Sequence, residues 1–386
     1  MKPSRPSFFA LIALIGGLAI FSSTLSKTPV LPLFAQSLNA TPAEIGWIVM
    51  ASTIPGVLIS YPAGALSDHL GTRRVLLASL VVFATAPFLY LVIETAWQLM
   101  AVRFYHGFAT AIFGTVASAA IAERYTADRA ARLSTYSSVT IVGRSIAPFL
   151  GGTLISLASF GAVYIACAIA GVLALGVGLL LEGHDQKSAA KLELPHFWSS
   201  LRTVLRDRGI MLVSAVEAAQ YLVFGAIEAF LALYASSLGI PAWQIGIILG
   251  VQLLSIVFAK PLMGKVSDRV GRRRVILPGL LIGAASVVLL PVFPNVIGLS
   301  VLSLAFGLGF ATVTSSTAAL VADLTKDGRF GSSMGVLRTV MDVGQSIGPV
   351  LTGFMVGVAG YASAFTLLAA IVVAAALMLG LLLRDA

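Results

Sequence analysis

Acidic side chains lie inside otherwise apolar segments of the sequence, where they could carry protons or hold a charged ligand. Glu217 and Glu228 are eleven residues apart in one such segment, with Tyr221 on the same stripe. Eleven residues make three helical turns plus about 20°, so a helix would place both carboxyls on one face, about 16 Å apart along its axis. A charged group in hydrocarbon costs about 2.5–3.5 kcal/mol on insertion scales. We therefore expect this face to border a cavity or a partner.

Lys27 and Glu228 form a candidate pair, because the chain carries an internal repeat with an offset of 200 residues. Under this offset Lys27 aligns with Ile227, directly beside Glu228. We expect the ammonium and the carboxyl to lie at related depths and to approach each other. Pairing would favour the ionised carboxylate and separation the protonated form, which would make the pair a proton switch. A permanent structural ion pair is the alternative.

Further charged residues also lie within apolar segments. Arg144 has no carboxylate at helical spacing, so it could meet an acid from another segment or an anionic group of a ligand. Asp342 follows Arg338 by four residues, the spacing of an ion pair within one helix. Lys260 lies near a predicted helix end, where it can reach the membrane surface. The residues predicted to couple protons or line a cavity are Lys27, Arg103, Arg144, Glu217, Tyr221, Glu228 and Asp342.

The segments that position these residues are predicted to be membrane-spanning helices. Apolar residues make up 58% of the chain and charged residues 11%, with a mean hydropathy of +0.97. A soluble surface needs about 25% charged residues, so these values exclude a water-soluble globule. The apolar stretches are long enough to cross a bilayer and lack the alternation of barrel strands. The twelve predicted spans are 8–36, 42–66, 75–93, 97–122, 133–157, 160–181, 210–235, 241–264, 275–294, 296–322, 332–358 and 361–383.

Lysine and arginine fall on one side of these spans. Twenty of the 25 lie in segments on the side of both termini, and none lies in the opposite loops. Because positive residues stay in the cytoplasm, both termini are predicted to be cytoplasmic, and the net charge of +9 reflects topology rather than nucleic-acid binding. The polar stretch 182–209 separates two six-helix bundles, 1–181 and 210–386. It is predicted to be a linker that either contains an interfacial helix or is a plain tether.

A glycine-framed basic segment occurs twice with the same 200-residue offset. The first copy, at 64–74, reads Gly-Ala-Leu-Ser-Asp-His-Leu-Gly-Thr-Arg-Arg, and the second, at 264–274, reads Gly-Lys-Val-Ser-Asp-Arg-Val-Gly-Arg-Arg-Arg. One constant offset is what internal duplication leaves behind. Glycine allows close helix approach, an aspartate can face the N-terminus of a neighbouring helix, and arginines can bind carboxylates. Basic topology signals alone are the simpler alternative.

This segment resembles the loop motif of the major facilitator superfamily of secondary transporters, and the resemblance covers nearly all 386 residues. It implies two pseudo-symmetric six-helix bundles and a cytoplasmic latch between them, with Asp68 at its centre. The arginines would bind carboxylates across the gap, with Glu123 and Asp323 as candidate partners. The residues of this predicted gate are Gly64, Asp68, Gly71, Arg73, Arg74, Glu123, Gly264, Asp268, Gly271, Arg273, Asp323 and Arg338.

Two more motifs resemble that family. The predicted fifth helix carries Gly143, Pro148, Gly151 and Gly152, which resemble the signature of its antiporters, although the 344–353 segment repeats the pattern. Glycine and proline also permit bends and close packing, so a purely structural role is the alternative. Arg103 resembles the arginine of the family's fourth helix, which the resemblance associates with proton coupling.

The sequence thus predicts an all-α, twelve-helix inner-membrane transporter that exports small drug-like or metabolite molecules in exchange for protons. Proton-driven uptake of an organic anion or nutrient is one alternative, and a non-transporting receptor or assembly factor is another. No phosphate-binding loop or metal-ligand spacing is present, so we expect neither an enzyme nor a cofactor or metal, only the proton gradient. The expected partners are a small organic substrate, protons and the lipid bilayer, and the protein is expected to be a monomer.

Overall fold

The computed structural model describes residues 7–56, 58–59, 67, 70–181, 204–325 and 330–382, and in these ranges the regular structure is helical, with no strand. Gly64, Asp68 and most of the predicted linker, 182–203, lie outside the described residues.

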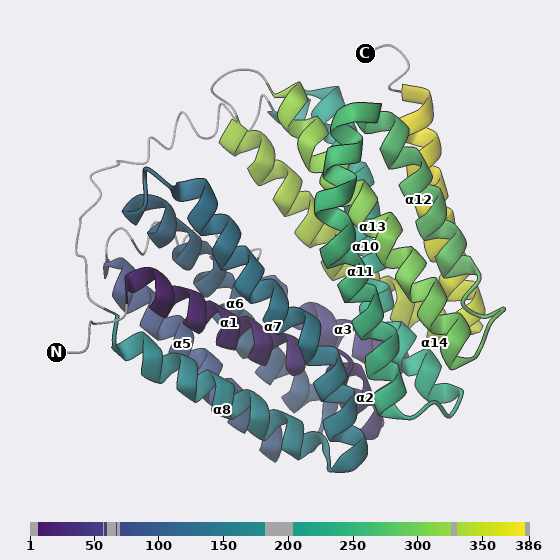
Figure 1. The fold of residues 1–386 in the computed structure, drawn as a ribbon. Coiled ribbons are helices and arrows are strands. Elements are labelled where there is room, and N and C mark those ends of the chain that lie inside the picture. The colour runs from purple at the N-terminus through teal and green to yellow at the C-terminus, as the bar shows by residue number, and fades with distance from the viewer. Residues whose placement is uncertain are drawn as a thin grey trace. The chain divides into compact units, whose positions relative to one another are not determined.

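The helices of the first half begin at clear sequence signals. Thr95 and Gln98 form a reciprocal capping box at the start of α6, and Ser159 caps α8 through its hydroxyl. The helices of this half are α1 (Phe8–Leu25), α2 (Val30–Ser37), α3 (Pro42–Ala51), α5 (Thr72–Leu89), the short 3₁₀ helix η1 (Tyr90–Val92), α6 (Ala96–Arg124), α7 (Arg129–Leu157) and α8 (Phe160–Leu179) (Figure 1).

The second half uses similar caps. Asp207 accepts a hydrogen bond from the backbone N–H of Ile210 at the start of α10, and Asn295 does the same for Gly298 at the start of α13. The helices are α10 (Arg208–Ser237), α11 (Ala242–Val270), α12 (Arg272–Val288), α13 (Val296–Leu324) and α14 (Phe330–Leu382). Gly360 has a φ of 78° inside α14, so α14 is two helices joined at a break.

The described helices agree with the predicted spans. Nine helical segments are long and apolar enough to cross a membrane, and the last of these, Ser333–Leu381, has 49 residues, enough for two crossings. With 17 residues, α12 is only slightly shorter than a usual span. α3 leads into a stretch of which the structure describes only part. The protein is therefore an all-α, multi-pass membrane protein.

The chain divides into two compact units. The first consists of Met1–Ala40 and Ile48–Ala189, and the second of Thr41–Trp47 and Ala190–Ala386. In the first unit α1 packs against α7 and α8, and α5 packs against α6 and α8. In the second unit α10 packs against α14 and α13, and α13 also packs against α11 and α12 (Figure 1).

The internal repeat recurs as matched contacts within each unit. α6 and α13 have bounds that differ by 200 residues at both ends. A Cβ on Gly107 of α6 would collide with the backbone oxygen of Ser52, and a Cβ on Gly307 of α13 would collide with that of Gln252. Both members of each pair are offset by 200, so the same glycine-mediated helix crossing occurs twice.

The repeated loop motif also gives matched backbone geometry. Gly71 and Gly271 have φ angles of 88° and 102° and occupy the N-cap positions of α5 and α12. A side chain is strained at such angles, which explains the glycine in both copies. Each glycine thereby starts a helix whose first turn carries the arginines of the motif.

Candidate functional site

The carboxyl of Glu217 lies inside the second unit, where three helices supply polar groups. Glu217 is on α10 and is 3% exposed. The Thr317 hydroxyl on α13 donates a hydrogen bond to Glu217 Oε2. Lys260 on α11 lies close enough for its charge to interact with the carboxyl. Lys260 is exposed, in keeping with its predicted reach to the membrane surface, and its interaction with Glu217 is additional.

The Thr317 hydroxyl is also 2.9 Å from the carbonyl oxygen of Val313. A hydroxyl has one hydrogen, so it cannot donate fully to both acceptors. With an ionised Glu217 it donates to the carboxylate, whereas with a protonated Glu217 it can accept from the carboxyl and donate to Val313. The same three groups thus satisfy their hydrogen bonds in either protonation state.

Aromatic rings pack between the same two helices, beginning one turn along α10 from Glu217. Tyr221 on α10 is half-buried and meets Phe224 and Phe310 edge to face, with ring centroids 6.2 Å and 5.0 Å away. Phe224 stacks on Phe310 of α13 at 4.5 Å. The stripe of Tyr221 therefore contributes to packing between α10 and α13.

Glu228 and Lys27, the predicted pair, belong to different units. Glu228 is 5% exposed on α10. Lys27 is half-buried and lies in the four-residue break between α1 and α2. Breaks of this kind in membrane helices often lie at binding sites, because they free backbone groups for ligands. Their mutual approach stays a prediction.

Arg103 is in the core of the first unit and is 4% exposed. Its guanidinium donates to the Ser52 hydroxyl at 2.8 Å and to the Tyr90 hydroxyl at 3.3 Å. Tyr90 in turn lies 3.2 Å from Nδ1 of His106, one turn after Arg103 on α6. Arg103 thus lies among neutral polar groups.

Arg144, Arg338 and Asp342 lie nearer the surface of their units. Arg144 on α7 and Arg338 on α14 are exposed, and Asp342 is half-buried. The charges of Arg338 and Asp342 interact, but the two side chains do not form the predicted ion pair. An exposed arginine on a membrane-spanning helix is costly against lipid, so Arg144 is expected to border water or a polar partner.

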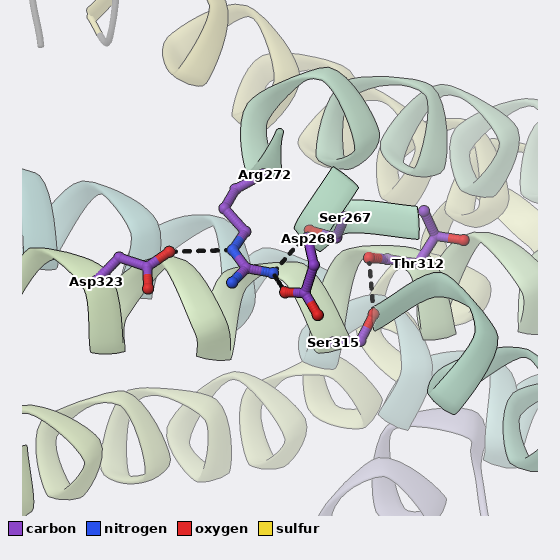
Figure 2. Close-up of polar contacts among 6 residues, drawn as sticks. All are labelled: Ser267, Asp268, Arg272, Thr312, Ser315 and Asp323. Carbon is purple, nitrogen blue, oxygen red and sulfur yellow. Dashed lines mark hydrogen bonds and ion pairs between the residues drawn. The ribbon is translucent and has the colours of Figure 1, made fainter. Parts of the chain in front are cut away.

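In the second copy of the loop motif, one arginine joins two acids (Figure 2). Arg272 Nε donates to Asp323 Oδ2 of α13 at 3.0 Å, and Arg272 Nη1 donates to Asp268 Oδ1, one turn earlier in the chain. Sequence analysis predicted Asp323 and Asp268 as gate residues but did not single out Arg272. The spacing of four residues between Asp268 and Arg272 could have identified it.

The arginines at the next position have another role. Arg73 donates to the backbone oxygens of Leu181 at 2.6 Å and Leu179 at 3.1 Å, at the end of α8. Arg273 donates to the backbone oxygen of Gly380 near the end of α14. Within each unit these side chains therefore bond helix C-terminal carbonyls and neutralise part of the helix dipole there. Their binding of carboxylates across the gap between the units stays a prediction.

The remaining described gate residues lie on the helices next to the two copies of the loop motif. Arg74 is exposed and lies 3.5 Å from the Leu70 carbonyl, and Glu123 is exposed at the end of α6 with no ion pair among the described residues. Gly264 lies inside α11 with open space at its Cα. The repeat offset aligns Glu123 with Asp323 and Thr72 with Arg272. The first copy therefore lacks the arginine that joins the acids of the second.

The glycines of the antiporter-like segment are packing positions. A Cβ on Gly143 of α7 would lie 2.9 Å from the Gly17 oxygen of α1, and one on Gly151 would lie 3.0 Å from Val30 of α2. Pro148 lies inside α7, and Gly152 is buried. These contacts favour the structural alternative for Gly143 and Gly151, and they give no sign of transport direction.

The family can be decided by comparison with known proteins. A model of the Major Facilitator Superfamily matches residues 12–250 and 213–386. The chain belongs to the Major Facilitator Superfamily.

Relatives of this superfamily member cover most of its length. An uncharacterized MFS-type transporter, MJ1560 of Methanocaldococcus jannaschii, is 24% identical over 87% of this chain and 88% of its own. The quinolone resistance protein NorA of Staphylococcus aureus is 24% identical over 84% of both chains. The crystal structure of the nucleoside transporter NupG has a TM-score of 0.82 at 14% identity and covers 99% of this chain and 100% of NupG. The protein is therefore a membrane transporter of the Major Facilitator Superfamily.

Proposed function

We propose that this transporter exports small organic molecules in exchange for protons, by alternating access. The observation that carries the proposal is the arrangement at Glu217, a buried carboxyl whose hydrogen bonds through Thr317 can be satisfied with or without a bound proton. Gaining or losing that proton changes the charge held in the membrane interior. A proton can then shift the balance between two states of the transporter wherever they expose this carboxyl differently.

Glu228 is the second proposed proton site. It lies on the same helix as Glu217 and is also buried. Lys27 is its predicted partner, and Arg103 is proposed to modulate the balance of states, as the family resemblance implies. With carboxyls at two depths along α10, the proton and the substrate would compete for one carboxyl and then for the other during the transport cycle.

The proposed substrate is a neutral, zwitterionic or anionic amphiphile. Arg144 is exposed on a membrane-spanning helix of the first unit, which favours contact with an anionic or polar group. Lys27 and Arg103 add positive charge to the same unit, so a purely cationic substrate is disfavoured there. The relative NorA, named for quinolone resistance, supports a drug-like molecule.

The proposed setting is a bacterial inner membrane, with both termini in the cytoplasm and a monomeric protein driven by the proton gradient alone. The charge distribution supports the orientation, because twenty of the 25 lysines and arginines lie on the side of the termini. Labelling of single cysteines with a membrane-impermeant reagent would test it, since Cys167 is the only cysteine and is buried.

The test is transport in proteoliposomes that contain a pH-sensitive dye, under an imposed pH gradient, with a panel of cationic, neutral and anionic compounds. Wild type is compared with Glu217→Gln and Glu228→Gln, and with Glu94→Gln as a control. Glu94 lies in an exposed turn between η1 and α6. Addition of the exported substrate should move protons in wild type and in the control, but not in Glu217→Gln.

Two results would contradict the proposal. The first is substrate flux without proton movement in the wild type, and the second is proton movement in Glu217→Gln equal to that of the wild type. The first would indicate uncoupled diffusion or another coupling ion, and the second would remove Glu217 from the mechanism. Substrate and protons moving in the same direction would establish the alternative, proton-driven uptake of an anion or nutrient.

A further inference from the structure

The cluster around Arg103 in the first unit has more hydrogen-bond donors than acceptors. Arg103, His106 and Tyr164 are 4%, 2% and 1% exposed, and each has a buried polar atom without a hydrogen-bond partner. These atoms are Arg103 Nε, His106 Nε2 and the Tyr164 hydroxyl. Buried polar groups in proteins are nearly always satisfied, so three exceptions in one cluster call for a ligand.

The hydrogen bonds of the cluster decide what the unpaired atoms are. Arg103 donates to the Tyr90 hydroxyl, so the single hydrogen of that hydroxyl is available for His106 Nδ1 at 3.2 Å. A neutral His106 that accepts at Nδ1 carries its hydrogen on Nε2. Arg103 Nε always carries a hydrogen. Two of the three unpaired atoms are therefore donors, and the third, a hydroxyl, can donate.

The Tyr164 hydroxyl belongs to the same cluster. The Tyr164 ring on α8 stacks on the Tyr90 ring of η1, with centroids 4.4 Å apart and planes within 8°. Arg103 also acts electrostatically on Tyr164 and on His106. Tyr164 of α8 thus packs on the tyrosine of η1 that the guanidinium contacts.

In the part of the chain that the structure describes, the positive charge of Arg103 has no carboxylate counter-charge. Among the described residues, no carboxylate lies within ion-pair distance of its guanidinium. The ends of α3 and α5 lie close by through Ser52 and Tyr90, and their carbonyls supply only partial negative charge. A buried cation of this kind is costly unless an anion accompanies it.

The fold itself does not require this cluster, as the internal repeat shows. The second unit has the same helices, but the 200-residue offset places Ser303, Phe306 and Leu290 where the first unit has Arg103, His106 and Tyr90. A serine and two apolar residues therefore suffice for the same crossing of helices. The polar cluster is an addition in the first unit.

We propose that this cluster binds a small inorganic monovalent anion such as chloride. The anion supplies the missing negative charge beside Arg103 and accepts hydrogen bonds from Arg103 Nε and the Tyr164 hydroxyl, with His106 Nε2 as the third donor. A halide suits the site because it only accepts hydrogen bonds. Arg103 lies seven residues into α6, about 10 Å along the helix from its start, so the site is near one membrane surface.

The test measures thermal unfolding of the purified full-length protein in detergent, with sodium chloride replaced stepwise by sodium gluconate at constant ionic strength. For the wild type we expect the midpoint to rise with the logarithm of chloride concentration above a dissociation constant, as for any ligand that binds only the folded state. Arg103→Gln should lose this dependence. Arg274→Gln, which removes an exposed arginine of the second unit, should keep it.

Tyr164→Phe is the decisive second variant if Arg103→Gln does not fold. It removes a buried hydroxyl that has no partner among the described residues, so stability in gluconate should not fall. The dissociation constant for chloride should rise about tenfold, since one donor to the anion is lost. In crystals grown with bromide, an anomalous peak beside Arg103 should mark the site.

Several results would overturn the proposal. One is a wild-type midpoint that does not depend on chloride, or that rises in the same way in Arg103→Gln. Another is an unchanged dissociation constant in Tyr164→Phe, which would mean that any anion binds elsewhere. None of these measurements involves transport, so the anion site can fail while proton-coupled export stands, and the reverse.

Discussion

Replacement of Gly348 by alanine should loosen the packing of α14 on α10. Gly344 and Gly348 are four residues apart on one face of α14, and a Cβ on either would collide with the backbone of α10, at Ala218 and Leu222 respectively. From the other side, a Cβ on Gly225 of α10 would lie 2.5 Å from the backbone oxygen of Gln345. Backbone atoms cannot rotate away, so the two helices must separate to admit a methyl group.

The size of the effect follows from two opposing terms. Alanine is favoured over glycine in a helix by about 1 kcal/mol. Overpacking a tight contact costs about 1–3 kcal/mol, and a collision with backbone belongs at the upper end of that range. Gly348→Ala should therefore destabilise the protein by about 2 kcal/mol. Gly357→Ala, on the same helix, has open space around the new methyl and should be neutral or stabilising by up to about 1 kcal/mol.

The assay is thermal unfolding of both variants in the same detergent and lipid, together with transport in proteoliposomes. A difference of about 3 kcal/mol corresponds to about 6–12 °C in midpoint for a bundle of this size. We expect Gly348→Ala to unfold first by that margin. Equal midpoints for the two variants would refute the reasoning, since they would show that α10 and α14 can part without cost.

Three further predictions concern side-chain contacts. Arg272→Gln should lower the free energy of unfolding by about 1 kcal/mol relative to Arg274→Gln. The effect is small because the side chains of Asp268 and Asp323 are 61% and 56% exposed, and such exposed pairs each contribute little. The difference should shrink in about 1 M salt, and a salt-independent difference would argue against ion pairing. Arg73→Ala should speed amide hydrogen exchange in the last turn of α8, whereas Arg74→Ala should leave it unchanged; equal rates in both variants would contradict the capping role. Thr317→Ser should retain proton coupling and Thr317→Val should reduce it, measured with the dye assay, while full coupling in Thr317→Val would show that the hydroxyl is dispensable.

The fold could be predicted from the sequence because its determinants are local and repeated. A bilayer sets the length of each apolar segment, and every backbone group must bond within its own helix. The capping residues Thr95 and Asn295 then mark where α6 and α13 begin. Since the two copies share an offset of 200, each span supported the assignment of its counterpart. The break at Gly360 falls between the predicted spans 332–358 and 361–383, as the length of one bilayer crossing requires.

Side-chain partners were harder to predict, because neighbouring residues on a helix point in different directions. Arg272 and Arg273 differ by one position, or 100° around α12, and this rotation sends one to Asp323 and the other to the end of α14. From the sequence, all arginines of the motif were predicted to bind carboxylates. Lys260 is exposed, as its predicted reach to the membrane surface requires, and the crossing of α11 with α10 and α13 also brings its charge near Glu217. No one-dimensional spacing reports such a crossing.

Duplication preserved the frame of the two units and not their chemistry. The second unit holds a carboxyl at Glu217 and the arginine at 272, where the first has Gly17 and Thr72. The first unit holds Arg103, where the second has Ser303. The buried carboxyl of Glu217 is therefore particular to the second unit, and the buried guanidinium of Arg103 to the first. Variants at Glu217 and Arg103 should accordingly fail in different assays.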